Sequence, residues 1–208
     1  MTSVVTICNM ALANIGHGQQ IEALTEGSNE AQQCNLFYEH CRDTALQDYR
    51  WGFSTAYAAL AKVADNPDPE FPYAFGIPVG CLKVWRIINQ AMPAALLHSQ
   101  GCVGVPEIPP TPYRIINGGG VRLLAAPVLT PTIEYTVRVT SSELFDPLFV
   151  SALSWLLASK IVGPLAKDPG IVTACLQQYR AEITNAAASD LNQSETNYVR
   201  ESAFITVR

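Results

Sequence analysis

The side chains best suited to chemistry in this sequence are its six cysteines and its three histidines. His40 lies beside Cys41 and six residues after Cys34, so a Cys/His zinc site can be considered. Zinc needs three or four ligands at short recurring spacings, and on a helix His40 points away from the face shared by Cys34 and Cys41. A nucleophilic Cys–His pair built on Cys41 or Cys81 would need the fold to bring an imidazole close. We therefore expect ordinary buried thiols, with no metal and no cofactor.

Other groups that bind ligands in proteins are present but do not form a recognisable site. The run Asn117-Gly118-Gly119-Gly120 lacks the Gly-Lys-Ser/Thr and the following helix of a phosphate-binding loop, so we interpret it as a hairpin turn. Carboxylates in the segment 65–70 are separated by prolines, which favours a plain loop over a cation site. We predict no catalytic residue. A thiol or hydrolase enzyme whose site is assembled only by the fold remains an alternative, as does a cytoplasmic helical scaffold protein.

Composition narrows the class of protein further. The 208 residues are 49% hydrophobic, which is enough for a full core, and only 15% charged. Such a low charged fraction is typical of a surface partly covered by partners, and a large core lowers it too. A net charge of −5 without any Lys/Arg cluster argues against a protein that coats nucleic acid. The N-terminus has no signal-peptide pattern, and no uninterrupted apolar run of about 18 residues predicts a membrane span. The scattered cysteines fit a reducing compartment, so we expect a soluble protein made in a cytoplasm.

Helical patterns occupy the first part of the chain. Ser3 is a plausible N-cap for a helix up to Ile15, and Ser28 begins a second, longer helix. Gly52 is expected to end that helix, and 53–63 to form a short third one. Trp51 and Phe53 flank the break, so we predict a packed elbow of Trp51, Gly52 and Phe53 that fixes the angle between two helices.

Strand patterns follow, and helices then return. Residues 82–89, the two arms of the Asn-Gly turn, and 132–140 alternate as antiparallel strands, the last of them half-buried. The 90–112 segment is long for a loop. Asp146-Pro147 and Asp168-Pro169 each indicate the start of a helix. We predict an α+β fold in which 1–64 and 141–190 form a helical bundle and 65–140 is an inserted β lobe.

The last part of the chain, 191–208, is predicted to be an extended assembly tail. Its sparse apolar residues cannot build a core, and "AFITV" has the character of a strand that pairs with a partner. Two arginines can pair with acidic surfaces. The residues expected at this interface are Leu191, Tyr198, Val199, Arg200, Phe204, Ile205, Val207 and Arg208.

The order of these motifs resembles the head–tail adaptor proteins of short-tailed phages, the tail tubular protein A-like family. The similarity lies in "ICNMALANIG", in the helix that runs into Arg-Trp-x-Phe, in "YAFGIPVGCLKV", in "YRIINGGGVRLL" with "IEYTVRV", and in "FDPLFVSALSWLLASKI". It spans roughly residues 7–185, and the long 90–112 loop departs from the family's compact lobe.

The resemblance implies a non-enzymatic structural protein of the virion neck, assembled in the host cytoplasm. It implies a dodecameric ring of the chain beneath the portal protein, joined to a tail nozzle or another tail protein. DNA would pass through the central channel as a non-specific cargo during ejection, and no membrane would be bound. The acidic balance of the chain suits such a channel, because DNA slides along a negative wall without sticking.

Overall fold

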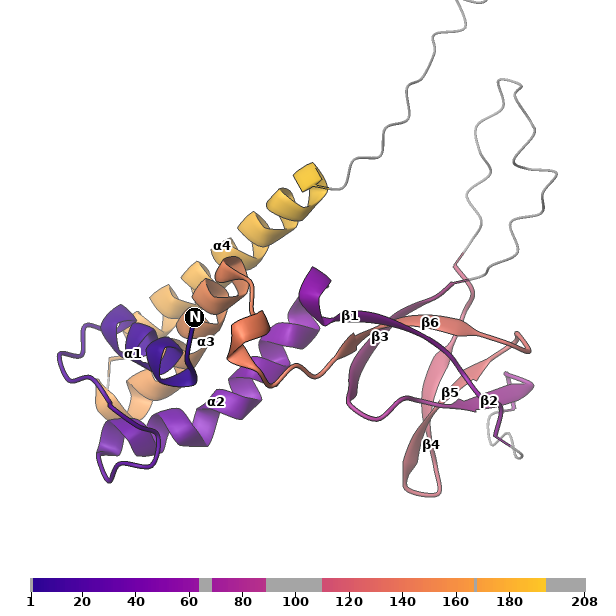
Figure 1. The fold of residues 1–208 in the computed structure, drawn as a ribbon, viewed down its shortest axis with the longest axis horizontal. Helices are drawn as coiled ribbons and strands as arrows, with labels where there is room; N and C mark the ends of the chain where they lie inside the picture. Colours follow the sequence, from indigo (N-terminus) through magenta and orange to yellow (C-terminus); the bar gives the residue numbers. More distant parts are fainter. Residues whose placement is uncertain (1, 64–68, 89–109, 167, 194–208) are drawn as a thin grey trace, which may run out of the picture. The chain divides into compact units, whose positions relative to one another are not determined.

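The computed structural model describes residues 2–63, 69–88, 110–166 and 168–193, which divide into two compact units. The helical unit combines Met1–Thr55 with Thr136–Glu195, and the β unit is built on Ala56–Tyr135. Figure 1 shows the helices and strands of each unit. The α+β class predicted from the sequence is confirmed, with four helices and two three-stranded antiparallel sheets. Both boundaries lie earlier in the chain than predicted. The first follows Thr55 instead of residue 64, because 55–59 is a strand. The second precedes Thr136 instead of residue 141, because 136–140 belongs to the helical unit.

Serine side chains begin the first two helices. In α1 (Val4–Asn14) the Ser3 hydroxyl accepts the Thr6 N–H at 3.1 Å. In α2 (Asn29–Asp48) the Ser28 hydroxyl accepts the Ala31 N–H at 3.2 Å. Both caps satisfy an N–H that the helix itself leaves unpaired, as the sequence predicted.

The two C-terminal helices begin at the Asp-Pro pairs. α3 (Pro147–Leu165) has Asp146 at its N-cap, although the carboxylate makes no capping hydrogen bond. α4 (Pro169–Gln193) follows, and the Asp168 carboxylate accepts the Gly170 N–H at 2.8 Å. Proline suits the first turn of a helix because the N–H that it lacks would have no partner there.

Helix α3 forms the centre of the helical unit. It packs against α1, α2 and α4, and its side chains are buried on nearly every side. By length and composition alone this helix could cross a membrane, and 61% of its apolar window is buried inside the unit. The three covering helices therefore account for its apolar composition.

The β unit contains six strands. They are β1 (Thr55–Ala59), β2 (Tyr73–Gly76), β3 (Cys81–Ile88), β4 (Arg114–Gly118), β5 (Val121–Ala126) and β6 (Thr132–Val137). One sheet has the order β1-β6-β3 and the other the order β2-β5-β4. The predicted hairpin joins β4 and β5: Gly119 and Gly120 have φ of 64° and 85°, and the Asn117 side chain accepts the Gly120 N–H.

Backbone and side-chain bonds connect the two sheets. Beyond β1, the Val63 N–H donates to the Ala74 carbonyl at 2.8 Å and the Gly76 N–H to the Ala61 carbonyl at 3.2 Å, so the chain that leaves β1 pairs with β2. At the other side, the Tyr113 hydroxyl donates to the Val84 carbonyl of β3 at 2.8 Å. The β unit is thus held as one body at both edges of its sheets.

The predicted third helix, 53–63, is wrong. This segment forms a short 3₁₀ turn, η1 (Gly52–Ser54), followed by β1. Its alanines favoured a helix, but the edge of β6 offers backbone partners, and the Leu60 N–H donates to the Pro131 carbonyl at 2.9 Å. Tertiary pairing therefore overrides local propensity here.

Strand β6 is not half-buried as predicted. Ile133 and Tyr135 lie on the expected buried face, but Glu134 and Thr136 on the opposite face are also buried. β6 is the central strand of its sheet, and the Glu134 carboxylate accepts a hydrogen bond from the Arg86 side chain of β3 at 2.5 Å. The polar positions of the alternating pattern therefore do not mark a solvent-facing side: the Glu134 side chain is 2% exposed and pairs with Arg86, whose side chain is 58% exposed.

The boundary of the predicted tail also changes. Helix α4 continues through Gln193, so Leu191 belongs to a helix and not to an extended segment. The other predicted tail residues, from Tyr198 to Arg208, lie outside the described residues, as does most of the 90–112 loop.

The contact between Tyr179 of α4 and Asp48 at the end of α2 gives a test of the bundle. The hydroxyl of the buried Tyr179 donates to the Asp48 carboxylate at 2.7 Å. We expect Tyr179→Phe to lower the free energy of unfolding by about 1 kcal/mol, since Asp48 is exposed and water can replace the hydroxyl. Urea denaturation measures this. Tyr57→Phe, at a tyrosine that is 62% exposed, is the control, and equal effects of the two changes would contradict the arrangement.

Candidate functional site

An aromatic cluster lies where the chain leaves the helical unit. After α2 ends at Asp48, the chain becomes extended and reaches Trp51, which is only 3% exposed. The Trp51 indole N–H donates to the Ala45 carbonyl in the last turn of α2 at 2.9 Å. The elbow residues Trp51, Gly52 and Phe53 therefore join a helix to a strand, not two helices. Gly52 does not end α2, and its surroundings leave room for a Cβ.

Two phenylalanines from the returning chain complete this cluster. The Trp51 ring meets the Phe149 ring of α3 edge-on, with centroids 5.1 Å apart. The centroid of the Phe53 ring lies 5.2 Å from that of Phe149 and 5.8 Å from that of Phe145. We call Tyr49, Trp51, Phe53, Phe145 and Phe149 the joint cluster. Sequence reasoning missed Phe145 and Phe149, although their spacing of four residues across the Asp-Pro cap was a usable signal.

An ion-pair network fastens the returning chain to α2. The Asp43 carboxylate accepts hydrogen bonds from the neighbouring Arg42 and pairs with Arg138, which follows β6, at 2.9 Å in each case. Arg42 is buried, so this pair is shielded from solvent on one side. The outgoing and returning segments are thus both fixed to the helical unit.

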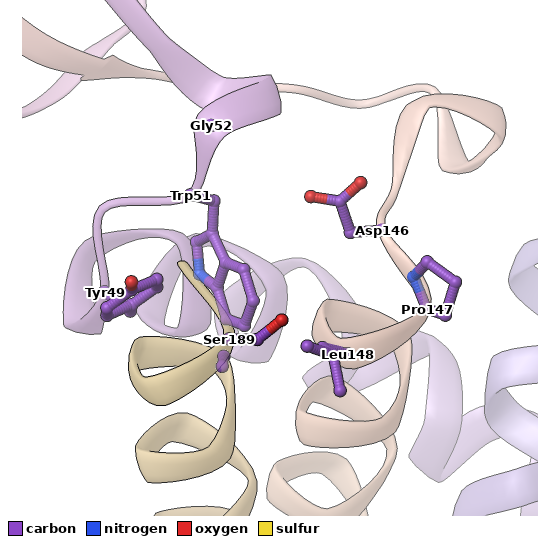
Figure 2. Close-up of a pocket in the computed structure, with 8 residues that line it drawn as sticks. Tyr49, Trp51, Gly52, Asp146, Pro147, Leu148 and Ser189 are labelled. Carbon is purple, nitrogen blue, oxygen red and sulfur yellow. The ribbon is translucent and has the colours of Figure 1, made fainter. Parts of the chain in front are cut away.

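A half-open pocket of about 240 Å³ lies beside the joint cluster. Figure 2 shows the Trp51 ring on one side of it, Asp146, Pro147 and Leu148 on the other, and Ser189 of α4 below. The lining residues combine apolar side chains with one carboxylate, that of Asp146, and two hydroxyls, those of Tyr49 and Ser189. Its lining residues are Tyr49, Trp51, Gly52, Asp146, Pro147, Leu148, Ala186 and Ser189.

Asp146 is the charged group of this pocket. Its carboxylate does not cap α3, and it has no hydrogen-bond or ion-pair partner within the part of the chain that the structure describes. Partial burial raises the pKa of Asp146 above its usual value, because the charged form loses hydration. A cation entering the pocket would compensate for that loss.

The thiols occupy interior positions, as predicted for five of them. Cys8, Cys34, Cys41, Cys81 and Cys175 are free and buried, and Cys102 lies outside the described residues. A hydrogen bond between the two thiols raises the pKa of Cys8, as burial also does, and lowers the pKa of Cys34. Burial raises the pKa of Cys41 to about 11 and also raises the pKa of Cys81. Cys41 and Cys81 are therefore protonated at neutral pH.

The histidines do not join these thiols. His17 forms a contact of 2.9 Å with Glu30, which ties the end of α1 to the start of α2. His40 is exposed, away from Cys34 and Cys41, and His98 lies outside the described residues. Among the residues that the structure describes, no group of three or more His, Cys, Asp or Glu is arranged to hold a metal ion.

Neither a protein-family model nor a curated protein matches this chain.

Trp51 provides the test of the joint cluster. Trp51→Ala removes a buried ring, its three aromatic contacts and its bond to Ala45. We expect the free energy of unfolding to fall by ~3–5 kcal/mol, as for other large-to-small changes in a core. Urea titration followed by circular dichroism measures it. Leu36→Ala, at an exposed residue of α2, should change stability by less than about 0.5 kcal/mol. A loss below ~1 kcal/mol for Trp51→Ala would contradict the packing.

The buried thiols give a second test. Iodoacetamide at pH 7 should label Cys8, Cys34, Cys41, Cys81 and Cys175 only after unfolding, because burial blocks access and, for Cys41 and Cys81, disfavours the thiolate. Mass spectrometry of peptides before and after denaturation reads the labelling at each position. Native mass measurement should find all six thiols free and no stoichiometric zinc. Rapid labelling of any of the five in the native protein would favour the thiol-enzyme alternative.

Proposed function

We propose that this chain is a structural head-to-tail adaptor of a phage virion. It forms a ring, dodecameric in our proposal, between the portal and the tail, with a central channel through which DNA passes. The supporting observation is the order of the fold: helices from both ends of the chain form one unit, and a β unit is inserted between α2 and α3. The motifs that resemble the tail tubular protein A-like family fall on α1, α2, β2–β3, β4–β6 and α3 in that order.

The surface of the chain is also suited to covering by partners. Large apolar side chains are exposed on both units, among them Leu36 and Leu144 on the helical unit and Val79 and Val121 on the β unit. Only 15% of the residues are charged, so few charged side chains are available to surround these apolar ones. In a ring, neighbouring copies, the portal protein and a tail protein would cover them.

The thiol-enzyme alternative receives less support. It requires an accessible thiol of lowered pKa beside a base. The described thiol whose pKa is lowered, Cys34, is fully buried, and its hydrogen-bond partner is another thiol. The carboxylate of the pocket, Asp146, has a raised pKa but no second titratable group among the lining residues other than Tyr49.

The ring is tested by mass. Native mass spectrometry or mass photometry of the full chain, alone and with its portal protein, should find an assembly of about a dozen copies. A chain that remains monomeric under both conditions would exclude the adaptor. Electron microscopy of the assembled particle would then locate the protein in the neck.

The C-terminal segment is tested by truncation after Gln193, the last residue of α4. The shortened protein should fold normally, because the cut leaves the described helices and strands intact. We expect the shortened protein no longer to bind the portal protein or neighbouring copies, since the apolar residues and arginines of the removed segment have the chemistry of a partner-binding strand. Circular dichroism checks the fold and native mass checks assembly. Unchanged assembly would mean that this segment is not the connector.

A further inference from the structure

The pocket beside the joint cluster has the chemistry of a socket for a cationic side chain. Its volume of about 240 Å³ is below the range of pockets for drug-sized ligands, but it admits the end of a long side chain. Apolar groups of Trp51, Pro147 and Leu148 can contact an aliphatic stem, and the Asp146 carboxylate can pair with the charge. The N-terminal end of α3 adds only a partial positive charge, which the full charge of Asp146 outweighs.

Exposed apolar side chains around the socket indicate that a protein covers it. Leu144, two residues before Asp146, is 61% exposed, and Leu148, which lines the pocket, is 36% exposed. Asp146 is itself exposed, so a partner that covers these apolar side chains would also cover its carboxylate and would have to pair with the charge. The occupant should therefore be a basic residue on a protein surface.

The same helical unit carries a suitable basic residue. Among its described cations, Arg42 and Arg138 are paired with Asp43, and Arg50 also has an interaction. Arg180 and Lys160 are exposed and have neither a hydrogen-bond nor an ion-pair partner through their side chains within the described residues. Of the two, Arg180 lies on α4, the helix that also contributes Ser189 to the pocket.

The positions of Arg180 and Ser189 on α4 decide how two copies can meet. Nine residues at 3.6 residues per turn place them about 180° apart around the helix axis. Cys175, Tyr179 and Ala186 form the buried stripe of α4, so Arg180 and the pocket lie on opposite flanks of that stripe. A copy cannot fill its own pocket with Arg180. Two complementary patches on opposite flanks of one element produce a head-to-tail contact, which closes into a ring when the rotation fits.

The exposed surface of α4 supports its burial between copies. Apart from Arg180, the exposed residues of its described part are small or neutral, including Ala174, Gln177, Ala181 and Thr184. Protein interfaces are depleted in charge at their centre and place arginine where a single cation is needed. An outer helix in free solution would normally carry several charges on such a face.

We propose that Arg180 of one copy inserts its guanidinium into the pocket of the next copy and pairs there with Asp146. This inference rests on the proposed ring and names the contact between its neighbouring subunits. The contact is heterologous, so each subunit uses its pocket on one side and its arginine on the other.

A charge exchange between full-length variants tests the contact. Asp146→Arg alone and Arg180→Asp alone place like charges together at every interface, so each should lower the association constant by at least about tenfold relative to the unmodified chain. An equimolar mixture of the two variants creates only opposite charges at interfaces between unlike copies. It should therefore recover rings in which the two variants alternate. The double variant Asp146→Arg, Arg180→Asp should assemble by itself.

The controls make matched changes of charge at positions that belong neither to the pocket nor to α4. They are Glu39→Arg, at an exposed residue of α2, and Lys160→Asp, at an exposed residue of α3. Both should assemble like the unmodified chain. Circular dichroism and thermal unfolding establish that each variant folds, and Asp146→Asn with Arg180→Gln replaces any variant that does not. These neutral changes should each weaken association by about tenfold or less.

Native mass spectrometry with one variant isotopically labelled reads the outcome. Restored rings of alternating composition support the contact. Normal assembly of either single reversal, or failure of the mixture to recover, overturns it while leaving the adaptor proposal intact. Recovery of dimers alone would show a two-fold symmetric contact and overturn the head-to-tail arrangement. If the unmodified chain forms no ring with or without the portal protein, both proposals fail.

Discussion

Helix α3 imposes the constraint on which the rest of this fold depends. Its side chains are apolar on nearly every side, so leaving any one side in water would cost the burial of several large residues. The chain covers it with α1 and α2 from the N-terminal end and with α4 from the C-terminal end. Because both ends of the chain are needed for this purpose, the β unit between them can only be an insertion.

An inserted unit requires two connections, and the structure fixes both to the helical unit. The outgoing connection is held by Trp51, whose indole bonds to α2 and whose ring packs on Phe149 of α3. The returning connection is held by Arg138 on Asp43 and by Phe145 in the same aromatic cluster. The pocket arises beside this cluster because the Asp-Pro start of α3 and the last turns of α4 meet the outgoing chain there.

The parts of this fold that could be predicted from the sequence are those set by local chemistry. Ser3, Ser28 and the two Asp-Pro pairs mark where helices begin, and the Asn-Gly turn marks a hairpin, because each depends on a side chain or a φ value within a few residues. Strand β1 could not be predicted in this way, since its alanines are compatible with a helix and its conformation depends on pairing with β6. Burial of Glu134 depends on Arg86, 48 residues earlier in the chain.

The candidate site was only partly visible in the sequence for the same reason. Trp51 could be expected in a packed joint from its position after a helix. The pocket could not, because its walls come from three segments that only the folded unit brings together. The proposed contact of Arg180 could not be predicted either, because it depends on the position of Arg180 relative to Ser189 across the buried stripe of α4.

The insertion also has a consequence for synthesis. Asp48 ends α2 and Pro147 begins α3, so about a hundred residues separate the first two helices from the helix that they cover. At 5–20 residues per second a ribosome needs roughly 5–20 s to cross that distance. During this interval the apolar faces of α1 and α2 have left the ribosome without their partner, while strands β2, β5 and β4 can already pair with their near neighbours. The growing chain then combines a folded β unit with two helices whose apolar faces are exposed to water. At this stage a chaperone would protect the chain from aggregating with other copies of itself.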